Sequence, residues 1–384
     1  MAHKTQKVRV VRLIRGVGPS SSPWNNFYGN ERKIAPGIAY PPVSIGINFK
    51  KYQWCKEWCL DQNRYYIKVG LVSSLIYLLK LATRTQSQGK ILIIHVHSPI
   101  LAIVALLIKL LKPKVKVVTT QHNDWRFFRP HQKLGLLVLT QISSSYITCG
   151  KAVVETIPSR IRKSLKSKGL LYSIPNGINP KQLKDYDHSF SVTHGENNTR
   201  KDKVIAVVVA RMIPQKNCQF LLHLLKNTFA IDRLIWFGDG VERKYIEQQI
   251  TRLGLEKRIE LRGCRPRHEV FTALSEATFY INASKWEGLS VADLEAVALG
   301  CWPIMSDIIQ RHEIAEKVGI PLYPLSNIDS WVAGINEFLT LPSKTQQEMR
   351  KKLAMKTREN FDLTVTVKQY IQLYYNLVKL SKDY

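Results

Sequence analysis

Short apolar runs alternate with longer stretches of helical periodicity along the first half of the chain. Buried strands are predicted where apolar and β-branched residues cluster, at residues 8–14, 91–97, 115–120 and 144–150. Amphipathic segments, such as residues 66–81 and 131–142, lie between these runs and predict helices. Alternating strands and helices are typical of parallel βαβ units that carry helices on both faces of a sheet.

The second half of the chain repeats this pattern. Its predicted strands are residues 203–210, 233–238, 258–263, 278–283 and 302–306. A polar stretch, residues 181–202, separates the halves, and residues 365–380 predict an apolar and aromatic helix. Because 384 residues are too many for one hydrophobic core, we expect two domains. The prediction is an α/β protein with two Rossmann-like doubly wound domains, 1–180 and 203–362, joined by the linker and followed by a C-terminal helix, 363–384. A ligand is expected at the carboxyl ends of the strands.

The longest apolar stretch, Ile91–Leu111, is not expected to cross a membrane. Two histidines, a proline and a lysine interrupt it. Ser98, as N-cap, and Pro99, at the first helical position, divide it into a strand and a helix. The remaining run, Ile100–Ile108, is far shorter than the roughly 20 residues that a span requires. The basic N-terminal sequence lacks the apolar segment of an export signal.

Composition adds an unusual charge to an otherwise ordinary globular chain. Hydrophobic residues make up 45% and charged residues 22%, yet the formal net charge is +28. Residues 1–190 hold 30 Lys/Arg against 7 Asp/Glu, whereas residues 191–384 hold 27 against 22. The basic half favours anionic partners, such as a membrane surface, nucleic acid or a phosphorylated substrate.

The basic residues cluster at 160–168, at 109–116 and in the N-terminal arm. A solvated basic face is one interpretation. A nucleic-acid partner is not expected, because no recognised module and no interleaving of aromatic and basic residues accompany the charge. Docking on anionic lipid is the favoured interpretation, since each Lys or Arg near such a surface contributes about 1 kcal/mol.

No metal site is predicted. The six cysteines are scattered, and we expect free thiols in a reducing cytosol; they are Cys55, Cys59, Cys149, Cys218, Cys264 and Cys301. Cys55 and Cys59 lack the second pair that a zinc site needs. Asp185 and Asp187 form an Asp-x-Asp pair, a pattern that binds metal in some enzymes, but they lie in the polar linker and away from any predicted strand end.

Residues 284–303 predict a tight loop and a helix after the strand at 277–283. Ser290, with Asp293 three residues later, predicts a helix start of the capping-box kind, and Gly300 is a natural stop. The start of such a helix favours a phosphate group, because its N–H groups and its dipole attract negative charge.

Charged residues accompany this helix start. Glu287 precedes it and Glu295 lies inside the helix; as carboxylates they bind phosphate poorly but accept hydrogen bonds from hydroxyl groups. Arg211 and Lys216 follow the strand at 203–210 and could neutralise a diphosphate. Ordinary surface acids and a solvated basic pair are the alternatives. A nucleotide sugar carries both hydroxyl and phosphate groups and would suit the arrangement.

Four blocks of sequence, taken together, resemble the retaining glycosyltransferases of family 4, also called group 1. They are residues 284–304 (SKWEGLSVADLEAVALGCWPI), 208–216 (VVARMIPQK), 237–263 with its Gly-Asp-Gly segment, and 174–178 (IPNGI). The resemblance is clear over about residues 170–320 and looser before them. It implies a GT-B fold, in which two Rossmann-like domains face each other across a cleft and a C-terminal helix crosses back to the first.

The resemblance also implies roles for single residues. It assigns a catalytic set, namely Arg211, Lys216, Glu287 and His122. It assigns a donor-binding set, namely Gly16, Gly18, Gly238, Gly240, Gly288, Leu289, Ser290 and Glu295. Glu287 would contact hydroxyls of the donor sugar and Glu295 the ribose diol, while residues 288–290 would face the diphosphate.

Other positions stay open or depart from the family pattern. His95 and His97 on one strand are expected to be structural, and Glu313 is either a family acid or a helix cap. The loop after the first strand lacks the usual Gly-Gly pair. In the region where the acceptor is expected it carries Trp24, Asn25 and Asn26.

The function implied is retaining transfer of a hexose-type sugar from a nucleoside diphosphate to an acceptor hydroxyl. The acceptor would be a lipid-linked or cell-surface glycan precursor. The enzyme would use no cofactor and no metal, and would lie on the inner face of the cytoplasmic membrane. A GT-B-type nucleotide-sugar epimerase and a catalytically silent membrane-bound scaffold are the alternatives.

Overall fold

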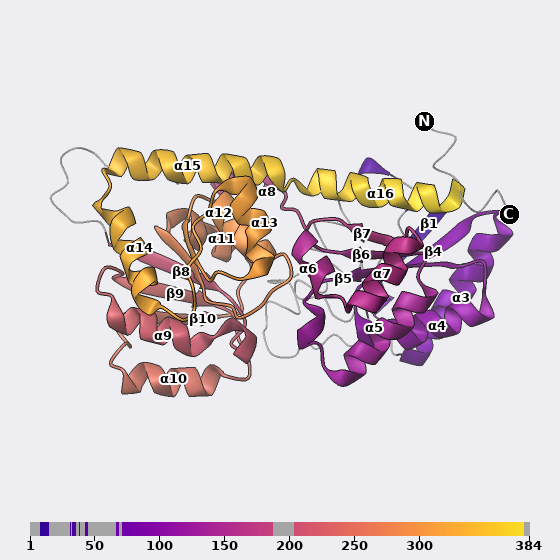
Figure 1. Cartoon of the computed structure of the whole chain (residues 1–384), viewed down its shortest axis with the longest axis horizontal. Helices are drawn as coiled ribbons and strands as arrows, with labels where there is room; N and C mark the ends of the chain where they lie inside the picture. The colour runs from indigo at the N-terminus through magenta and orange to yellow at the C-terminus, as the bar shows by residue number, and fades with distance from the viewer. Residues whose placement is uncertain are drawn as a thin grey trace. The chain divides into compact units, whose positions relative to one another are not determined.

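A computed structural model describes residues 8–14, 31, 33–35, 38, 43–44, 67–68, 71–186 and 203–379. The chain divides into two compact units. The first comprises Met1–Asn176 and Leu363–Tyr384, and the second comprises Gly177–Asp362. Figure 1 shows the elements of each unit. The positions Gly16, Gly18, Trp24, Asn25, Asn26, Cys55, Cys59 and Asp187, and most of the expected linker, lie outside the described residues.

The first unit is built on a seven-stranded parallel sheet of order β3-β2-β1-β4-β5-β6-β7. Its strands are β1 (Val8–Ile14), β2 (Val43–Ser44), β3 (Ile67–Lys68), β4 (Ile91–Val96), β5 (Lys116–Gln121), β6 (Ser145–Thr148) and β7 (Leu171–Ser173). The four strands predicted in this half are confirmed as β1, β4, β5 and β6. The other three have only two or three residues, too few for a hydrophobic period to be recognised.

Helices cover both faces of this sheet. They are α3 (Leu71–Ser87), α4 (Ala102–Leu111), α5 (Pro130–Ile142), α6 (Lys151–Thr156), α7 (Ser159–Ser167) and α16 (Leu363–Lys379), with 3₁₀ turns η2 (Pro99–Leu101) and η3 (Trp125–Phe127). Successive strand residues point to opposite faces. Val8 and Val10 of β1 therefore pack in the core with α16, whereas Val11 and Leu13 pack with α3 and α4 (Figure 1).

The second unit contains a five-stranded parallel sheet of order β10-β9-β8-β11-β12. Its strands are β8 (Ile205–Val209), β9 (Arg233–Phe237), β10 (Ile259–Gly263), β11 (Phe279–Asn282) and β12 (Trp302–Met305), all of them predicted. Its helices are α8 (Pro180–Leu183), η5 (Pro214–Lys216), α9 (Cys218–Asn227), α10 (Arg243–Arg252), α11 (Arg267–Glu276), α12 (Val291–Ala298), α13 (Ile309–Val318), α14 (Ile328–Thr340) and α15 (Ser343–Asn360). A bridge between Ile178 and Asp362 ties the start of the unit to its end.

The α/β class with two doubly wound parallel sheets is thus confirmed. In each sheet the order reverses beside the first strand, between β1 and β4 in the first unit and between β8 and β11 in the second. Ligands of such sheets bind at this switch point, beyond the carboxyl ends of the strands. The switch points therefore indicate where functional side chains should be sought.

The apolar stretch Ile91–Leu111 divides as expected. It forms β4 and then α4, which has ten residues. Pro99 opens a 3₁₀ turn between them, and Ser98 makes no side-chain cap hydrogen bond. None of the helices among the described residues is long and apolar enough to span a bilayer.

Candidate active site

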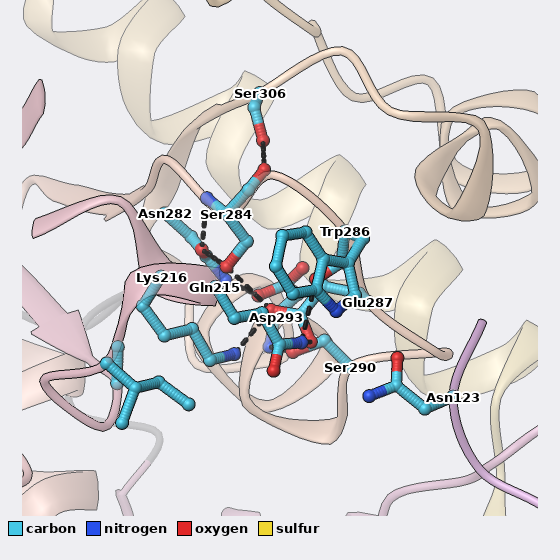
Figure 2. A network of polar contacts seen from close by, with 12 residues as sticks. Asn123, Gln215, Lys216, Asn282, Ser284, Trp286, Glu287, Ser290, Asp293 and Ser306 are labelled. Atoms are coloured by element: carbon cyan, nitrogen blue, oxygen red, sulfur yellow. Dashed lines mark hydrogen bonds and ion pairs between the residues drawn. The ribbon is translucent and has the colours of Figure 1, made fainter. Parts of the chain in front are cut away.

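A partly buried ion pair bridges the switch point of the second unit. Lys216 lies in η5, just after β8, and Glu287 lies in the loop that follows β11. The Lys216 ammonium pairs with Glu287 Oε1, and the two side chains are 13% and 9% exposed. Figure 2 shows the lysine directed at the carboxylate. Two of the predicted catalytic residues are therefore brought together from positions 71 residues apart.

The loop that carries Glu287 is held by further hydrogen bonds to the β8 side. Gln215 Nε2 donates to the Trp286 carbonyl at 2.8 Å, and the Lys285 amide donates to the Gln215 carbonyl at 2.9 Å. Ser284 Oγ donates to Glu287 Oε1 at 2.7 Å (Figure 2). The carboxylate is thus fixed before any ligand arrives. Gln215 and Ser284 were not predicted as site residues, although both lie within the motif blocks 208–216 and 284–304.

The helix α12 begins at Ser290, whose Oγ accepts a hydrogen bond from the Asp293 amide at 3.3 Å. The expected capping box is only half formed. Asp293 turns into the core instead, where its Oδ2 pairs with Arg311 Nε at 2.9 Å and its Oδ1 accepts from Asn282 Nδ2 at 2.6 Å. Burial alone would raise the pKa of Asp293, but the charge and hydrogen bond of Arg311 outweigh it and lower that pKa. Asp293 is therefore an anchor of α12.

Glu295 lies in the second turn of α12 and is buried. It pairs with Arg267, the first residue of α11. Burial raises the pKa of Glu295, and the charge of Arg267 opposes that shift. The Arg267 guanidinium also lies over the Phe271 ring, 4.8 Å from its centroid. No motif pointed to Arg267, because its contact with Glu295 is made across 28 positions of sequence.

The Gly-Asp-Gly segment packs against the turn that carries Arg211. A Cβ on Gly238 would lie 2.0 Å from the Ala210 carbonyl oxygen, and one on Gly240 would lie 2.1 Å from that of Met212. The Met212 amide, in turn, donates to the Asp239 carbonyl at 3.2 Å. These glycines therefore permit two loops at the switch point to touch. The Arg211 side chain is exposed and forms no ion pair among the residues that the structure describes.

The resemblance assigns Gly240 to nucleotide binding, so we expect Gly240→Ala to weaken that binding about tenfold or more, because the new Cβ displaces the 210–212 turn. Calorimetric titration with UDP and with GDP measures this. Gly254→Ala is the matched control, since Gly254 also stands in the second unit and has open space around it but a positive φ of 66°. The control should lose about 1–2 kcal/mol of stability and keep its nucleotide affinity. Equal affinity in both variants would contradict the role given to Gly240.

A second polar cluster lies at the switch point of the first unit. Arg12 of β1 is buried and donates from Nη2 to Glu31 Oε1 at 2.8 Å and to the Tyr374 hydroxyl at 2.8 Å. Its Nη1 lies 2.8 Å from His95 Nδ1 and 2.9 Å from His97 Nε2. The cluster joins β1 and β4 to α16. A basic residue inside the apolar run VRVVRLI was the signal that the sequence analysis overlooked.

His122 follows β5 and adjoins this cluster. Its Nε2 lies 2.9 Å from His97 Nδ1. Burial, with the nearby charge of Arg12, lowers the pKa of His122 to about 4. The pKa values of His95 and His97 are also lowered, chiefly by burial. All three imidazoles are therefore neutral at pH 7. His95 and His97 form part of a buried network, in line with the structural role expected for them.

The first unit should lose stability as the pH falls. Each of these histidines has a folded-state pKa below its ordinary value of 6.5, so below that pH the unfolded chain binds protons that the folded state does not. For His122 this loss runs from pH 6.5 down to about 4, at up to about 1.4 kcal/mol per pH unit. Urea unfolding at several pH values measures the slope. His122→Asn should reduce it, whereas replacement of the exposed His223 by Asn should not; equal slopes would contradict this account.

The remaining candidate residues occupy varied places. Gly288 and Leu289 lie between Glu287 and the start of α12, and Leu289 is buried. Glu313 is the fifth residue of α13, where it pairs with Lys317 at 2.9 Å, and the N-cap position of that helix is Ile308. The four cysteines among the described residues form no disulfide with one another; they are Cys149, Cys218, Cys264 and Cys301. Within the described ranges no three His, Cys, Asp or Glu side chains come together as a metal site would require.

The fold and the site define a class of protein. Two doubly wound units, with an acid–base pair, a helix start and a buried glutamate at one switch point, are typical of nucleotide-dependent enzymes. The family described as "Glycosyl transferases group 1" matches residues 190–359, and the one described as "Glycosyltransferase Family 4" matches residues 62–182. The chain belongs to this family of group 1, or family 4, glycosyltransferases.

Individual relatives agree with this assignment. A phosphatidylinositol N-acetylglucosaminyltransferase subunit of Saccharomyces cerevisiae is 26% identical over 34% of this chain and 29% of its own length. The UDP-Gal:alpha-D-GlcNAc-diphosphoundecaprenol alpha-1,3-galactosyltransferase of Escherichia coli is 25% identical over 53% of this chain and 54% of its own length. The chain thus spans from under a third to about half of these relatives.

The GT-B fold is shown by solved structures. HepE of Anabaena, solved in complex with UDP and glucose, superposes with a TM-score of 0.72 at 15% identity. The superposition covers 95% of this chain and 99% of that one. At this identity the likeness concerns the fold alone.

Proposed function

We propose that this glycosyltransferase moves a hexose-type sugar from a nucleoside diphosphate to an acceptor hydroxyl, with retention of anomeric configuration. The observation that carries the proposal is the partly buried Lys216–Glu287 pair at the β8/β11 switch point, beside the start of α12. A cation and a helix start suit a diphosphate, and a fixed carboxylate suits sugar hydroxyls.

In this proposal the site acts by electrostatic preorganisation. Negative charge grows on the departing phosphate as the glycosidic bond breaks, and Lys216, Arg211 and the start of α12 lower the energy of that charge. Lys216 and the start of α12 are held by their own contacts before the reaction, so little reorganisation accompanies bond cleavage. Because protein cations and helix N–H groups supply this stabilisation, we propose that the transfer needs no metal ion.

In this proposal the two glutamates bind hydroxyl groups of the donor. Glu287 accepts hydrogen bonds from sugar hydroxyls, and Glu295 from the ribose diol once its pairing with Arg267 loosens. They do not act as the acid and nucleophile of a glycosidase, because those two carboxyls must flank the scissile bond. Instead, the acceptor hydroxyl attacks the sugar from the face that the phosphate leaves, and the leaving phosphate oxygen accepts the proton of that hydroxyl.

The donor and acceptor classes are supported by what related proteins bind. HepE was solved with UDP and glucose, and the E. coli relative is named for a UDP-sugar donor and a diphosphoundecaprenol acceptor. We propose a nucleoside-diphosphate sugar as donor and a lipid-linked or cell-surface glycan precursor as acceptor. The protein would then work at the inner face of the cytoplasmic membrane, attached peripherally to its anionic surface.

Purified protein incubated with UDP-, GDP- and ADP-sugars should release nucleotide from one donor class, faster when a lipid-linked acceptor is added. Thermal shift with UDP, GDP and ADP selects the base, because a ligand of the native state raises the melting temperature. Turnover should survive EDTA, and Glu295→Ala should abolish most of it. Unchanged turnover in Glu295→Ala, or conversion of the donor sugar to an epimer without acceptor, would overturn the proposal.

A further inference from the structure

One face of the first unit is apolar where it meets solvent. Helices α3, α4 and α5 form a layer that packs through its inner side on β1, β4 and β5 (Figure 1). More than half of the large apolar side chains exposed in the described part of the chain lie on this layer and the adjoining η3 turn. They are Val72, Ile76, Ile103, Leu107, Leu110, Leu111, Phe127, Leu134 and Leu137, here called the α3–α5 face.

The central helix of this face, α4, is apolar at every position except Lys109. Val104, Ala105 and Ile108 of α4 are buried against the sheet. Its outer side carries Leu110 and Leu111, which are 66% and 58% exposed. A helix on the surface of a soluble protein normally has a polar outer side, whereas one that is apolar all round is normally buried. An apolar surface of this extent indicates a partner.

Basic residues border the apolar side chains, and acids are nearly absent. Residues 71–137 contain ten Lys/Arg and one acid, Asp124, which pairs with Arg126 at 2.6 Å. On α3 the stripe that begins with Val72 and Ile76 continues, at four-residue steps, with two exposed bases, Lys80 and Arg84. The apolar side chains of the α3–α5 face therefore lie among positive charges.

We propose that the α3–α5 face docks on an anionic lipid bilayer, with its apolar side chains at the acyl boundary and its Lys and Arg among the headgroups. An apolar surface edged by cations matches this boundary, where burial of apolar area and attraction to anionic lipid act together. A nucleic acid would engage the charge but leave the leucines exposed to water. A protein partner would normally meet a surface depleted in lysine.

The apolar side chains also distinguish the α3–α5 face from a second basic region, helix α7, as the surface that binds the bilayer; the sequence alone did not distinguish the two. Helix α7 carries four Lys/Arg, two more than α3, and its Lys163 and Lys166 are exposed, yet no large apolar side chain of α7 is exposed. Charge alone gives weak, salt-sensitive adsorption, whereas charge with apolar insertion gives binding that persists at higher salt. The inference extends the proposed function, because the same docking would bring the first unit to a lipid-linked acceptor.

The test measures co-sedimentation of the full chain with vesicles made of equal parts phosphatidylglycerol and phosphatidylcholine, and with vesicles of phosphatidylcholine alone. Wild-type protein should bind the first kind and not the second. Leu110→Gln/Leu111→Gln should weaken binding about tenfold or more, and Lys80→Gln/Arg84→Gln should weaken it at low salt. Glutamine preserves the helices, since its helix propensity is close to those of leucine, lysine and arginine.

Two matched controls change the same chemistry elsewhere. Phe229→Gln/Met355→Gln removes two exposed apolar side chains of the second unit, and Lys163→Gln/Lys166→Gln removes two charges from α7. Both should bind vesicles nearly as wild type does. Circular dichroism confirms that each variant is folded.

Three results would overturn the docking surface. The first is equal binding of the wild type to charged and uncharged vesicles, and the second is binding of the α3–α5 variants that is no weaker than that of the controls. The third is a dimer, detected by light scattering, that dissociates in Leu110→Gln/Leu111→Gln, because the α3–α5 face would then bind a second copy of the chain. Thermal shifts of the same variants with UDP and GDP test the donor site independently of the docking surface. A failed vesicle test with intact nucleotide binding rejects only the docking surface, and the reverse outcome rejects only the donor site.

Discussion

Lys216→Ala should lower kcat/KM for sugar transfer about 10²- to 10³-fold, the effect seen when one preorganised charge-stabilising group is removed. In the proposed mechanism Lys216 supplies positive charge where the leaving phosphate becomes negative, and in the structure it pairs with Glu287. The alanine variant loses the first role and leaves a carboxylate without its cation. The measurement is donor-dependent nucleotide release at saturating acceptor, with kcat and KM determined separately.

The matched control is Lys226→Ala, which removes an exposed lysine from the nearby helix α9. It should retain wild-type turnover. Glu287→Gln keeps the shape of the side chain and its bond from Ser284 but removes the charge, so it should impair turnover while folding normally. If Lys216→Ala is as active as Lys226→Ala, the switch-point pair is not the catalytic centre.

Arg311→Met should destabilise the second unit by about 3–5 kcal/mol, the usual effect of leaving one partner of a buried ion pair unpaired. The pair Arg311–Asp293 is 1% and 0% exposed, and it fixes α12 to β11 and to the Ser306 backbone. Methionine fills much of the same space but cannot donate a hydrogen bond. Urea unfolding at neutral pH measures the loss.

Arg233→Met is the matched control, because Arg233 pairs with Glu260 at the surface, where both side chains are more than a third exposed. Such pairs contribute about 0–1 kcal/mol. A similar loss in both variants would contradict the structural role of Arg311.

The pH dependence gives a further check on Asp293. In the wild type its lowered pKa contributes stability above the ordinary value of 3.8, and this is lost as the pH falls through the lowered pKa. Arg311→Met removes the two largest influences that lower this pKa, whereas burial still raises it and Lys216 and Asn282 still lower it. The pKa of Asp293 is therefore higher in the variant than in the wild type, and the variant loses less stability as the pH falls. The difference in the free energy of unfolding between the wild type and Arg311→Met should therefore become smaller as the pH falls.

Much of the fold was predictable from local sequence. Runs such as 203–210 and 278–283 are apolar because both faces of a parallel strand are buried, and this makes them recognisable. The strands β2, β3 and β7 were not recognised, because each has two or three residues and is defined by its neighbour in the sheet. Asp293 was interpreted as part of a capping box from its spacing to Ser290, yet the core beneath it offered Arg311.

In the candidate site, too, local sequence predicted some features, and packing between distant elements decided others. Spacing within one loop and helix placed Glu287, Ser290 and Glu295 around a single helix start, and the structure places them there. Spacing gave no indication of Arg267, whose contact with Glu295 depends on how α11 packs beside α12. The Arg12 cluster likewise unites β1, β4 and α16, which are separated by up to 362 positions of sequence.

The sequence by itself determined the class of fold, the order of the elements and the family, because these follow from hydrophobic period and from local motifs. Only the tertiary structure decided which charges pair, which histidines are held neutral and which of two basic regions is joined to an apolar face. The physical reason is that burial and ion pairing depend on distances in space. Such distances are set by packing between elements that lie far apart along the chain.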